Sequence, residues 1–134
     1  LQTADRKEEV KRGKGDKAGA PYARDARVLQ HCFSGSAELA RQYVKLGATI
    51  SMAGPLTYKN NRRGVEVAET IPIEYLLVET DSPYLAPEPH RGRKNRPEFV
   101  QFTARRLADI KRISYEETAR ITCENAIRFF NIEK

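Results

Sequence analysis

The chain has 134 residues, with 24 Lys and Arg against 18 Asp and Glu, so its formal net charge is +6. This length suits one domain but is too short for a complete (β/α)8 barrel, which needs about 250 residues. No apolar run approaches the ~20 residues of a membrane span, and the charged N-terminus does not resemble a secretory signal. Two cysteines, Cys32 and Cys123, cannot build a disulfide scaffold. We therefore expect a cytoplasmic protein without a membrane segment.

Residues 1–27 differ in composition from the rest of the chain. They hold eight basic and five acidic side chains, three glycines and few apolar groups. Such a segment buries too little apolar surface to offset the entropy of ordering it, so we expect a flexible basic segment followed by one domain over residues 28–134. The basic excess favours an acidic partner, nucleic acid first, although a solvated surface gives the same composition.

A strand–helix–strand pattern begins after this segment. Residues 28–33 form a short apolar run, as in a buried strand. Ser36 is a natural N-cap for the helix that follows, and Gly47 stands where a C-cap glycine is expected. Residues 49–52 give the next strand. These elements have the length and order of a βαβ unit.

The pattern then repeats once more. A helix is expected over residues 61–69, weakened by Gly64 at a cost of about 1 kcal/mol relative to Ala and ended by Pro72. Residues 75–80 are apolar along most of their length, as in a central parallel strand. The order predicts an α/β fold, with about three parallel strands joined by right-handed crossover helices.

The end of the chain is expected to be helical. A loop rich in Pro and Gly follows Asp81, and a first helical segment starts near Pro97. Ser114 and Glu117 form a capping box that opens a second segment, and a third presents Phe129 and its neighbours.

Two side chains stand at the carboxyl ends of predicted strands. His31 ends the first strand, and Asp81 directly follows the third, with Glu79 on the same strand face. Ligands and catalytic groups gather at this edge of parallel sheets. An imidazole and a carboxylate there could form a metal site or an acid/base pair; they could equally be a turn histidine and a capping aspartate. Two ligands are fewer than the three of a usual catalytic zinc site.

Cations and amides populate the loops on the same edge. Lys59 follows the second strand, and Arg91 and Asn95 follow the third. Together they favour contact with phosphate, although each alone is typical of a solvated surface.

Five blocks of the sequence closely resemble the signature blocks of the TatD family, in the same order. The first three blocks are His31–Ser36, Tyr58–Asn60 and Glu79–Pro87. The last two are Arg91-Gly92 with Asn95 and Pro97, and Thr122 with Glu124-Asn125-Ala126. The resemblance implies a TIM-type barrel of the amidohydrolase-like group. It also implies metal-dependent hydrolysis of DNA, and in some members RNA, by a 3′–5′ exonuclease that uses a divalent cation such as Mg²⁺, Mn²⁺ or Zn²⁺.

The resemblance also assigns roles to single residues. It makes His31 and Asp81 metal ligands, and Asp81 also the catalytic residue that helps activate the attacking water. Lys59, Arg91 and Asn95 fall on motif positions that could hold the substrate backbone.

Other ligand motifs of the family are missing. The chain contains no His-x-His, no E-x-G-x-D block and no I-H-S/T-R block. We therefore expect a partial TIM-type barrel, the C-terminal portion of a nuclease, that is inactive alone. Its open sheet edges would pair with the rest of the barrel or with a second copy. Two alternatives remain: an amidohydrolase-like enzyme acting on another ester or amide, and a non-catalytic basic remnant that binds nucleic acid.

Overall fold

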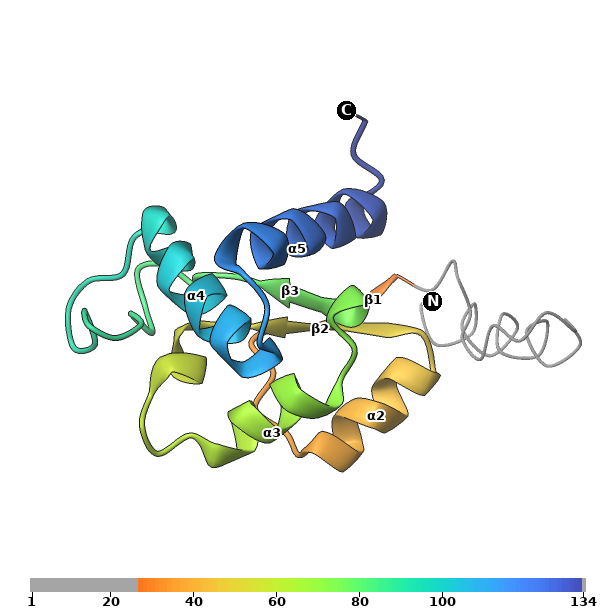
Figure 1. Ribbon diagram of the computed structural model, residues 1–134, viewed down its shortest axis with the longest axis horizontal. Helices are drawn as coiled ribbons and strands as arrows, with labels where there is room; N and C mark the ends of the chain where they lie inside the picture. Colours follow the sequence, from red (N-terminus) through yellow and green to blue (C-terminus); the bar gives the residue numbers. More distant parts are fainter. Residues whose placement is uncertain (1–26, 134) are drawn as a thin grey trace, which may run out of the picture.

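The computed structural model describes residues 27–133 and contains a three-stranded parallel sheet. The strands are β1 (Val28–Gln30), β2 (Ala48–Met52) and β3 (Leu76–Val78), in the order β1-β2-β3 (Figure 1). The expected α/β fold with parallel strands is confirmed. β1 is shorter than predicted, because the backbone leaves the strand conformation at His31 and is left-handed at Cys32, with φ of 46°.

Helices lie on both faces of the sheet. α2 (Ala37–Lys45) and α3 (Arg62–Thr70) cover one face, and α5 (Tyr115–Phe130) lies over the other (Figure 1). α4 (Val100–Lys111) packs against both α3 and α5, so it joins the two layers. The described residues contain no helix with the length and apolar character needed to cross a membrane.

The buried core lies between the sheet and the layer formed by α2 and α3. Alternate residues of β2 and β3 point into it, because successive side chains of a strand face opposite sides. The buried members are Ala40, Val44, Ile50, Met52, Leu56, Val67, Ala68, Ile71, Leu76 and Leu107.

The helix starts follow the predicted capping chemistry. Ser36 Oγ accepts the N–H of Leu39 at 3.1 Å, and Ser114 Oγ accepts the N–H of Glu117 at 3.0 Å. The carboxylate of Glu117 pairs with Arg120 instead of returning to the cap, so half of the expected capping box forms. That hydrogen bond with Arg120 lowers the pKa of Glu117.

The end of the chain differs from the expected three helical segments. The first begins as a 3₁₀ turn, Pro97–Phe99, that leads into α4, and the second and third are a single helix, α5. Asn125, a poor helix former, is held inside α5 because its side-chain amide donates to the carbonyls of Ile73 and Leu76. Residues 115–130 contain no Gly or Pro, so nothing in them interrupts one continuous helix. The expected flexible segment, residues 1–27, lies outside the described residues except for Arg27.

Candidate metal site

His31 and Asp81 meet at the carboxyl edge of the sheet. His31 follows β1 and Asp81 follows β3, and His31 Nε2 lies 3.7 Å from Asp81 Oδ1. Their side chains are 62% and 36% exposed, so a ligand can reach both. The structure thus brings together the two residues that the sequence singled out.

Main-chain hydrogen bonds continue the sheet past the ends of its strands. The N–H of Phe33 donates to the carbonyl of Ser51 at 3.0 Å, and the N–H of Glu79 donates to the carbonyl of Met52 at 2.9 Å. The segments beside His31 and Asp81 are therefore both held on β2.

Two residues at this edge have left-handed backbone. Cys32 has φ of 46° and Asp81 has φ of 58°. The left-handed region costs about 1–2 kcal/mol for most L-residues, although aspartate is enriched there. At Asp81 the sharp turn directs the chain out of β3 into the loop over residues 82–96.

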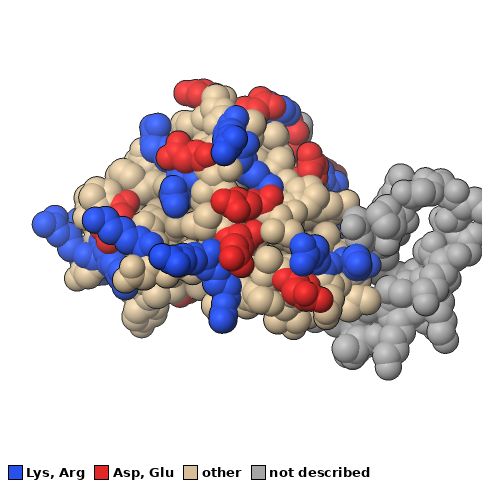
Figure 2. All heavy atoms as spheres, turned by 60° about the horizontal axis from the view of Figure 1, so that its bottom comes forward, with Lys and Arg blue, Asp and Glu red and all other residues tan. Residues whose placement is uncertain are grey.

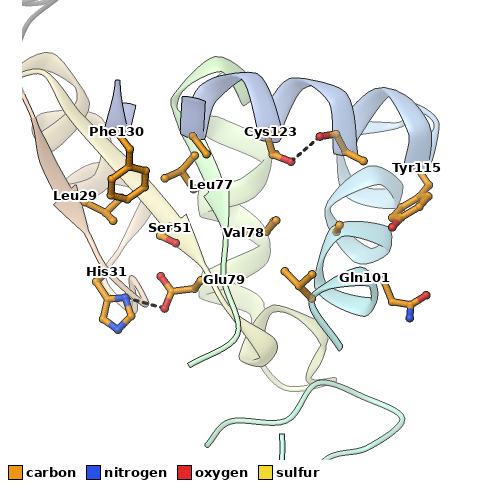
Figure 3. Close-up of a pocket in the computed structure, with 15 residues that line it drawn as sticks. Leu29, His31, Ser51, Leu77, Val78, Glu79, Gln101, Tyr115, Cys123 and Phe130 are labelled. Atoms are coloured by element: carbon orange, nitrogen blue, oxygen red, sulfur yellow. Dashed lines mark hydrogen bonds and ion pairs between the residues drawn. The ribbon is translucent and has the colours of Figure 1, made fainter. Parts of the chain in front are cut away.

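Glu79 connects the two outer strands of the sheet. Its Oε2 accepts the N–H of Cys32 at 3.0 Å, and its Oε1 lies 2.8 Å from Nδ1 of His31 (Figure 3). The Glu79 side chain is 16% exposed. The sequence placed Glu79 on the same strand face as Asp81. The contact of Glu79 with the backbone of Cys32 depends on the left-handed turn, which no sequence pattern predicted.

Cys32 occupies the turn directly after His31. It is half-buried and lies beyond the end of β1. Burial raises the pKa of its thiol, and the carboxylates of Glu79 and Asp81 raise it further. Because the thiolate is the form that binds metals, the neutral thiol is a poor ligand.

The donor set of this edge fits a divalent cation. Imidazole nitrogen and carboxylate oxygen are both ligands of Zn²⁺ and related ions. Two such ligands of a tetrahedral ion stand about 3.4 Å apart, close to the 3.7 Å between Nε2 and Oδ1. Between residues 27 and 133, however, no three His, Cys, Asp or Glu side chains cluster around a common metal position. A complete site would need further ligands.

Lys59, Arg91 and Asn95, the predicted substrate-binding residues, are here called the rim. Their surroundings differ. Lys59 is exposed in the turn before α3. The guanidinium of Arg91 lies 3.8 Å from the centroid of the Tyr58 ring. The hydroxyl of Tyr58 donates to the carbonyl of Ala86 at 2.9 Å, and burial raises its pKa although Arg91 opposes the shift. These contacts hold the loop after β3 against the segment after β2.

Asn95 is built into that loop. Its side chain is buried, and its amide donates to the carbonyls of Thr80 at 2.6 Å and Tyr84 at 2.8 Å. Its Oδ1 accepts the N–H of Arg96. All of these polar groups are committed to backbone partners, so Asn95 fixes the shape of the loop.

Basic side chains gather around the same loops. Figure 2 shows Lys and Arg on the side of the molecule where Figure 1 places the loops after β2 and β3. The exposed cations of these loops and of the start of α3 are Lys59, Arg62, Arg63, Arg91, Arg93, Lys94 and Arg96. The second histidine, His90, stacks on Phe99 with ring centroids 4.1 Å apart.

A cavity of about 540 Å³ lies between the sheet and α5. Leu29, Ser51 and Leu77 line it from the sheet, on the face opposite the core, and Phe130 lines it from α5. His31 and Glu79 lie at one end of it (Figure 3). This sheet face corresponds to the interior of the expected barrel.

Known proteins resemble the chain in both sequence and fold. YabD of Bacillus subtilis, an uncharacterized metal-dependent hydrolase, is 46% identical over 104 residues, which are 78% of this chain and 41% of the relative. YcfH of Escherichia coli K12, also an uncharacterized metal-dependent hydrolase, is 43% identical over 109 residues, covering 81% of this chain and 41% of the relative. The chain thus spans about two fifths of the length of these relatives.

The fold also matches a solved structure, that of YjjV, a TatD homologue from Escherichia coli K12. The TM-score is 0.73 at 31% identity, covering 78% of this chain and 40% of that one. The expected part of a TIM-type barrel agrees with this likeness. Residues 15–131 match the family described as TatD related DNase. By this match, which takes in His31, Glu79 and Asp81, the chain belongs to the TatD-related DNase family.

Proposed function

We propose that this chain supplies part of the active site of a metal-dependent hydrolase that cleaves phosphodiester bonds of DNA or RNA as a 3′–5′ exonuclease. The observation that carries the proposal is the approach of His31 Nε2 to Asp81 Oδ1, 3.7 Å apart at the carboxyl edge of the sheet. A nitrogen and an oxygen donor at this edge, beside a basic rim, suit an anionic substrate.

His31 and Asp81 would hold the divalent cation, Mg²⁺, Mn²⁺ or Zn²⁺. When bound, such an ion lowers the pKa of a coordinated water and polarises a phosphoryl oxygen. Asp81 would orient the attacking water and accept its proton, because its carboxylate is partly exposed and faces the same space as Nε2. His31 would contribute its nitrogen lone pair.

The rim would hold the substrate backbone. Lys59 and Arg91 lie in the loops after β2 and β3, where their charges can meet successive phosphates. Asn95 would serve the site indirectly, since its amide holds the loop that carries Arg91.

The two ligands do not complete a catalytic site, which usually has three from the protein. The missing ligands would come from other polypeptide, the rest of a barrel. We therefore expect the 134-residue chain alone to show no nuclease activity.

A chimera tests the proposal. Residues 28–134 would replace the matching segment of Bacillus subtilis YabD, and the product would be incubated with Mn²⁺ and 5′-labelled single-stranded DNA. Stepwise shortening from the 3′ end, lost in Asp81→Asn and kept in the exposed control Asp109→Asn, is the expected result.

Three results would contradict the proposal. Hydrolysis of carboxylic esters or cyclic amides without DNA cleavage would favour an amidohydrolase-like enzyme. Salt-sensitive, metal-independent DNA binding without cleavage would favour a binding module. Robust cleavage by the 134-residue chain itself, lost in Asp81→Asn, would show that no further ligands are needed.

A further inference from the structure

We infer that Glu79 is a positioning residue for His31 and fixes its neutral imidazole as the Nδ1–H tautomer, so that the Nε2 lone pair faces Asp81. The functional importance of this tautomer rests on the proposed function, in which His31 is a metal ligand. The tautomer itself follows from contacts in the protein.

The Glu79 side chain reaches across the sheet toward His31. β1 and β3 do not pair with each other, because β2 lies between them. Neighbouring strands are about 4.8 Å apart, so the Glu79 side chain crosses over β2. At its far end, Oε2 meets the N–H of Cys32 at 3.0 Å and Oε1 meets His31 Nδ1 at 2.8 Å. Figure 3 shows the two side chains pointing toward each other from the segments that follow β1 and β3.

The two carboxylate oxygens are not equally satisfied. Oε2 accepts an aligned hydrogen bond from the backbone N–H of Cys32, and a backbone amide is always a donor. Oε1 is buried and has no aligned hydrogen-bond partner among the described residues; His31 Nδ1 faces it at ion-pair distance. A buried carboxylate oxygen without a donor is unfavourable, so the site favours a proton on Nδ1.

A neutral imidazole carries one N–H, and its two nitrogens therefore have opposite roles. With the proton on Nε2, the lone pair of Nδ1 would face the lone pairs of Glu79 Oε1 at 2.8 Å, which is repulsive. With the proton on Nδ1, a small rotation of the ring aligns an N–H with Oε1. A carboxylate behind a histidine ligand commonly sets the tautomer and ring orientation in this way.

The separation on the other side of the ring agrees with this assignment. Nε2 and Asp81 Oδ1 lie 3.7 Å apart, beyond the 2.7–3.2 Å of a hydrogen bond. In the Nδ1–H tautomer both atoms are acceptors, so no hydrogen bond can draw them together. They form the open pair of donors that a cation would bridge.

Glu79→Gln makes an unusually sharp prediction because glutamine offers one acceptor and one donor group. If its carbonyl oxygen accepts the N–H of Cys32, its NH₂ faces Nδ1 of His31 and needs a lone pair there. The reverse placement sets two donors against each other at Cys32. The favoured arrangement in the variant therefore has His31 as the Nε2–H tautomer, opposite to the wild type.

The experiment is long-range ¹H–¹⁵N NMR of the full 134-residue chain near pH 8.5, about two units above the ordinary histidine pKa of ~6.5. The chain has two histidines, so His90 is an internal reference. In the wild type we expect the His31 proton on Nδ1. In Glu79→Gln it should lie on Nε2, and in the exposed control Glu66→Gln it should stay on Nδ1. His90 should be unchanged in both variants.

The wild-type spectrum alone can overturn the inference, so it does not depend on whether a variant folds. A protonated Nε2 on His31 in the wild type excludes it. A folded Glu79→Gln that keeps Nδ1–H also excludes it. The side chain in Glu79→Asp is one methylene shorter and cannot reach His31 Nδ1. The His31 spectrum of this variant should therefore differ from that of the wild type.

A second measurement links the tautomer to metal binding. Mn²⁺ alone should broaden the His31 signals of the wild type at concentrations about tenfold lower than in Glu79→Gln. Equal broadening in both proteins would contradict the positioning role. Because neither measurement involves substrate, an inactive chimera with the expected tautomer would refute the proposed nuclease activity and leave this inference standing.

Discussion

Arg91 and Tyr58 form a stacked pair that joins two loops of the carboxyl edge. The guanidinium lies 3.8 Å from the ring centroid, and the hydroxyl of Tyr58 reaches back to the carbonyl of Ala86. Thr57 adds a third connection, since its Oγ1 accepts the N–H of Glu88 at 2.8 Å. The loop after β3 is therefore fixed to the segment after β2, and its cations have defined positions.

Arg91→Ala should weaken binding of single-stranded DNA and make it less salt-dependent. Each phosphate contact adds about 0.7 to the magnitude of the slope of log K against log salt, so the slope should fall by about that amount. Fluorescence anisotropy with a labelled oligonucleotide at several salt concentrations measures it. Arg41→Ala, an exposed change on α2, is the control, and an equal fall there would contradict a specific contact.

Asp81→Asn should weaken divalent-cation binding more than about tenfold while leaving the fold intact. Asparagine accepts the left-handed backbone of this position, with φ of 58°, so the free energy of unfolding should change by less than about 0.5 kcal/mol. Titration with Mn²⁺, followed by the EPR signal of the free ion, gives the affinity. His90→Ala is the matched control, and unchanged Mn²⁺ binding in Asp81→Asn would exclude Asp81 as a ligand.

Gly54→Ala should destabilise the protein by about 3 kcal/mol. A Cβ at Gly54 would stand 2.1 Å from the carbonyl oxygen of Leu85 and 3.0 Å from the nitrogen of Pro87, so the loop after β3 must move. Gly92→Ala meets no atom within 4 Å and should cost only the strain of its φ of +87°, about 1–2 kcal/mol. Urea unfolding of both variants compares them, and an equal loss would contradict the steric argument.

Asn125→Ala should destabilise the protein by about 2–4 kcal/mol, because the carbonyls of Ile73 and Leu76 lose their amide donors in a buried position. Asn60→Ala makes the same chemical change at an exposed position, and it should change the free energy of unfolding by less than about 0.5 kcal/mol. Thermal unfolding followed by circular dichroism measures both. A small loss at Asn125 would show that water replaces the side chain.

Lys111 should make the stability rise with pH in the alkaline range. Burial lowers the pKa of its ammonium group, which donates to the carbonyls of Glu69 and Ile71. Between that lowered pKa and the ordinary ~10.4, the unfolded chain binds more protons, so the free energy of unfolding increases with pH. The free energy of unfolding of the wild type minus that of Lys111→Met should increase with pH across this window in urea titrations. A difference that shrinks as pH rises would contradict this sign.

Local signals in the sequence identified most of the elements and both residues of the candidate metal site. Ser36, Asn61 and Ser114 act as N-caps, and α3 ends before Pro72, because these residues determine helix ends within a few positions of themselves. His31 and Asp81 could be paired because parallel strands bring their carboxyl ends to one edge.

Features that depend on distant partners were not predictable in this way. The left-handed turn at Cys32 shortens β1, and its N–H bonds to Glu79 on a strand two places away. Asn125 of α5 has its partners at the backbone carbonyls of Ile73 and Leu76. Asn95, at a motif position that could hold substrate, donates its amide to the carbonyls of Thr80 and Tyr84. In each case a hydrogen bond formed only in the folded protein decides the conformation.

The central strand β2 supplies neither His31 nor Asp81, yet it sets the spacing between them. The carbonyls of Ser51 and Met52 hold the segments that carry the two residues, one on each side. An insertion or deletion between Ser51 and Met52 would shift these two segments relative to each other even if every chemically active side chain were kept. A strand that carries neither candidate ligand is therefore as constrained in length at this point as the site is in composition.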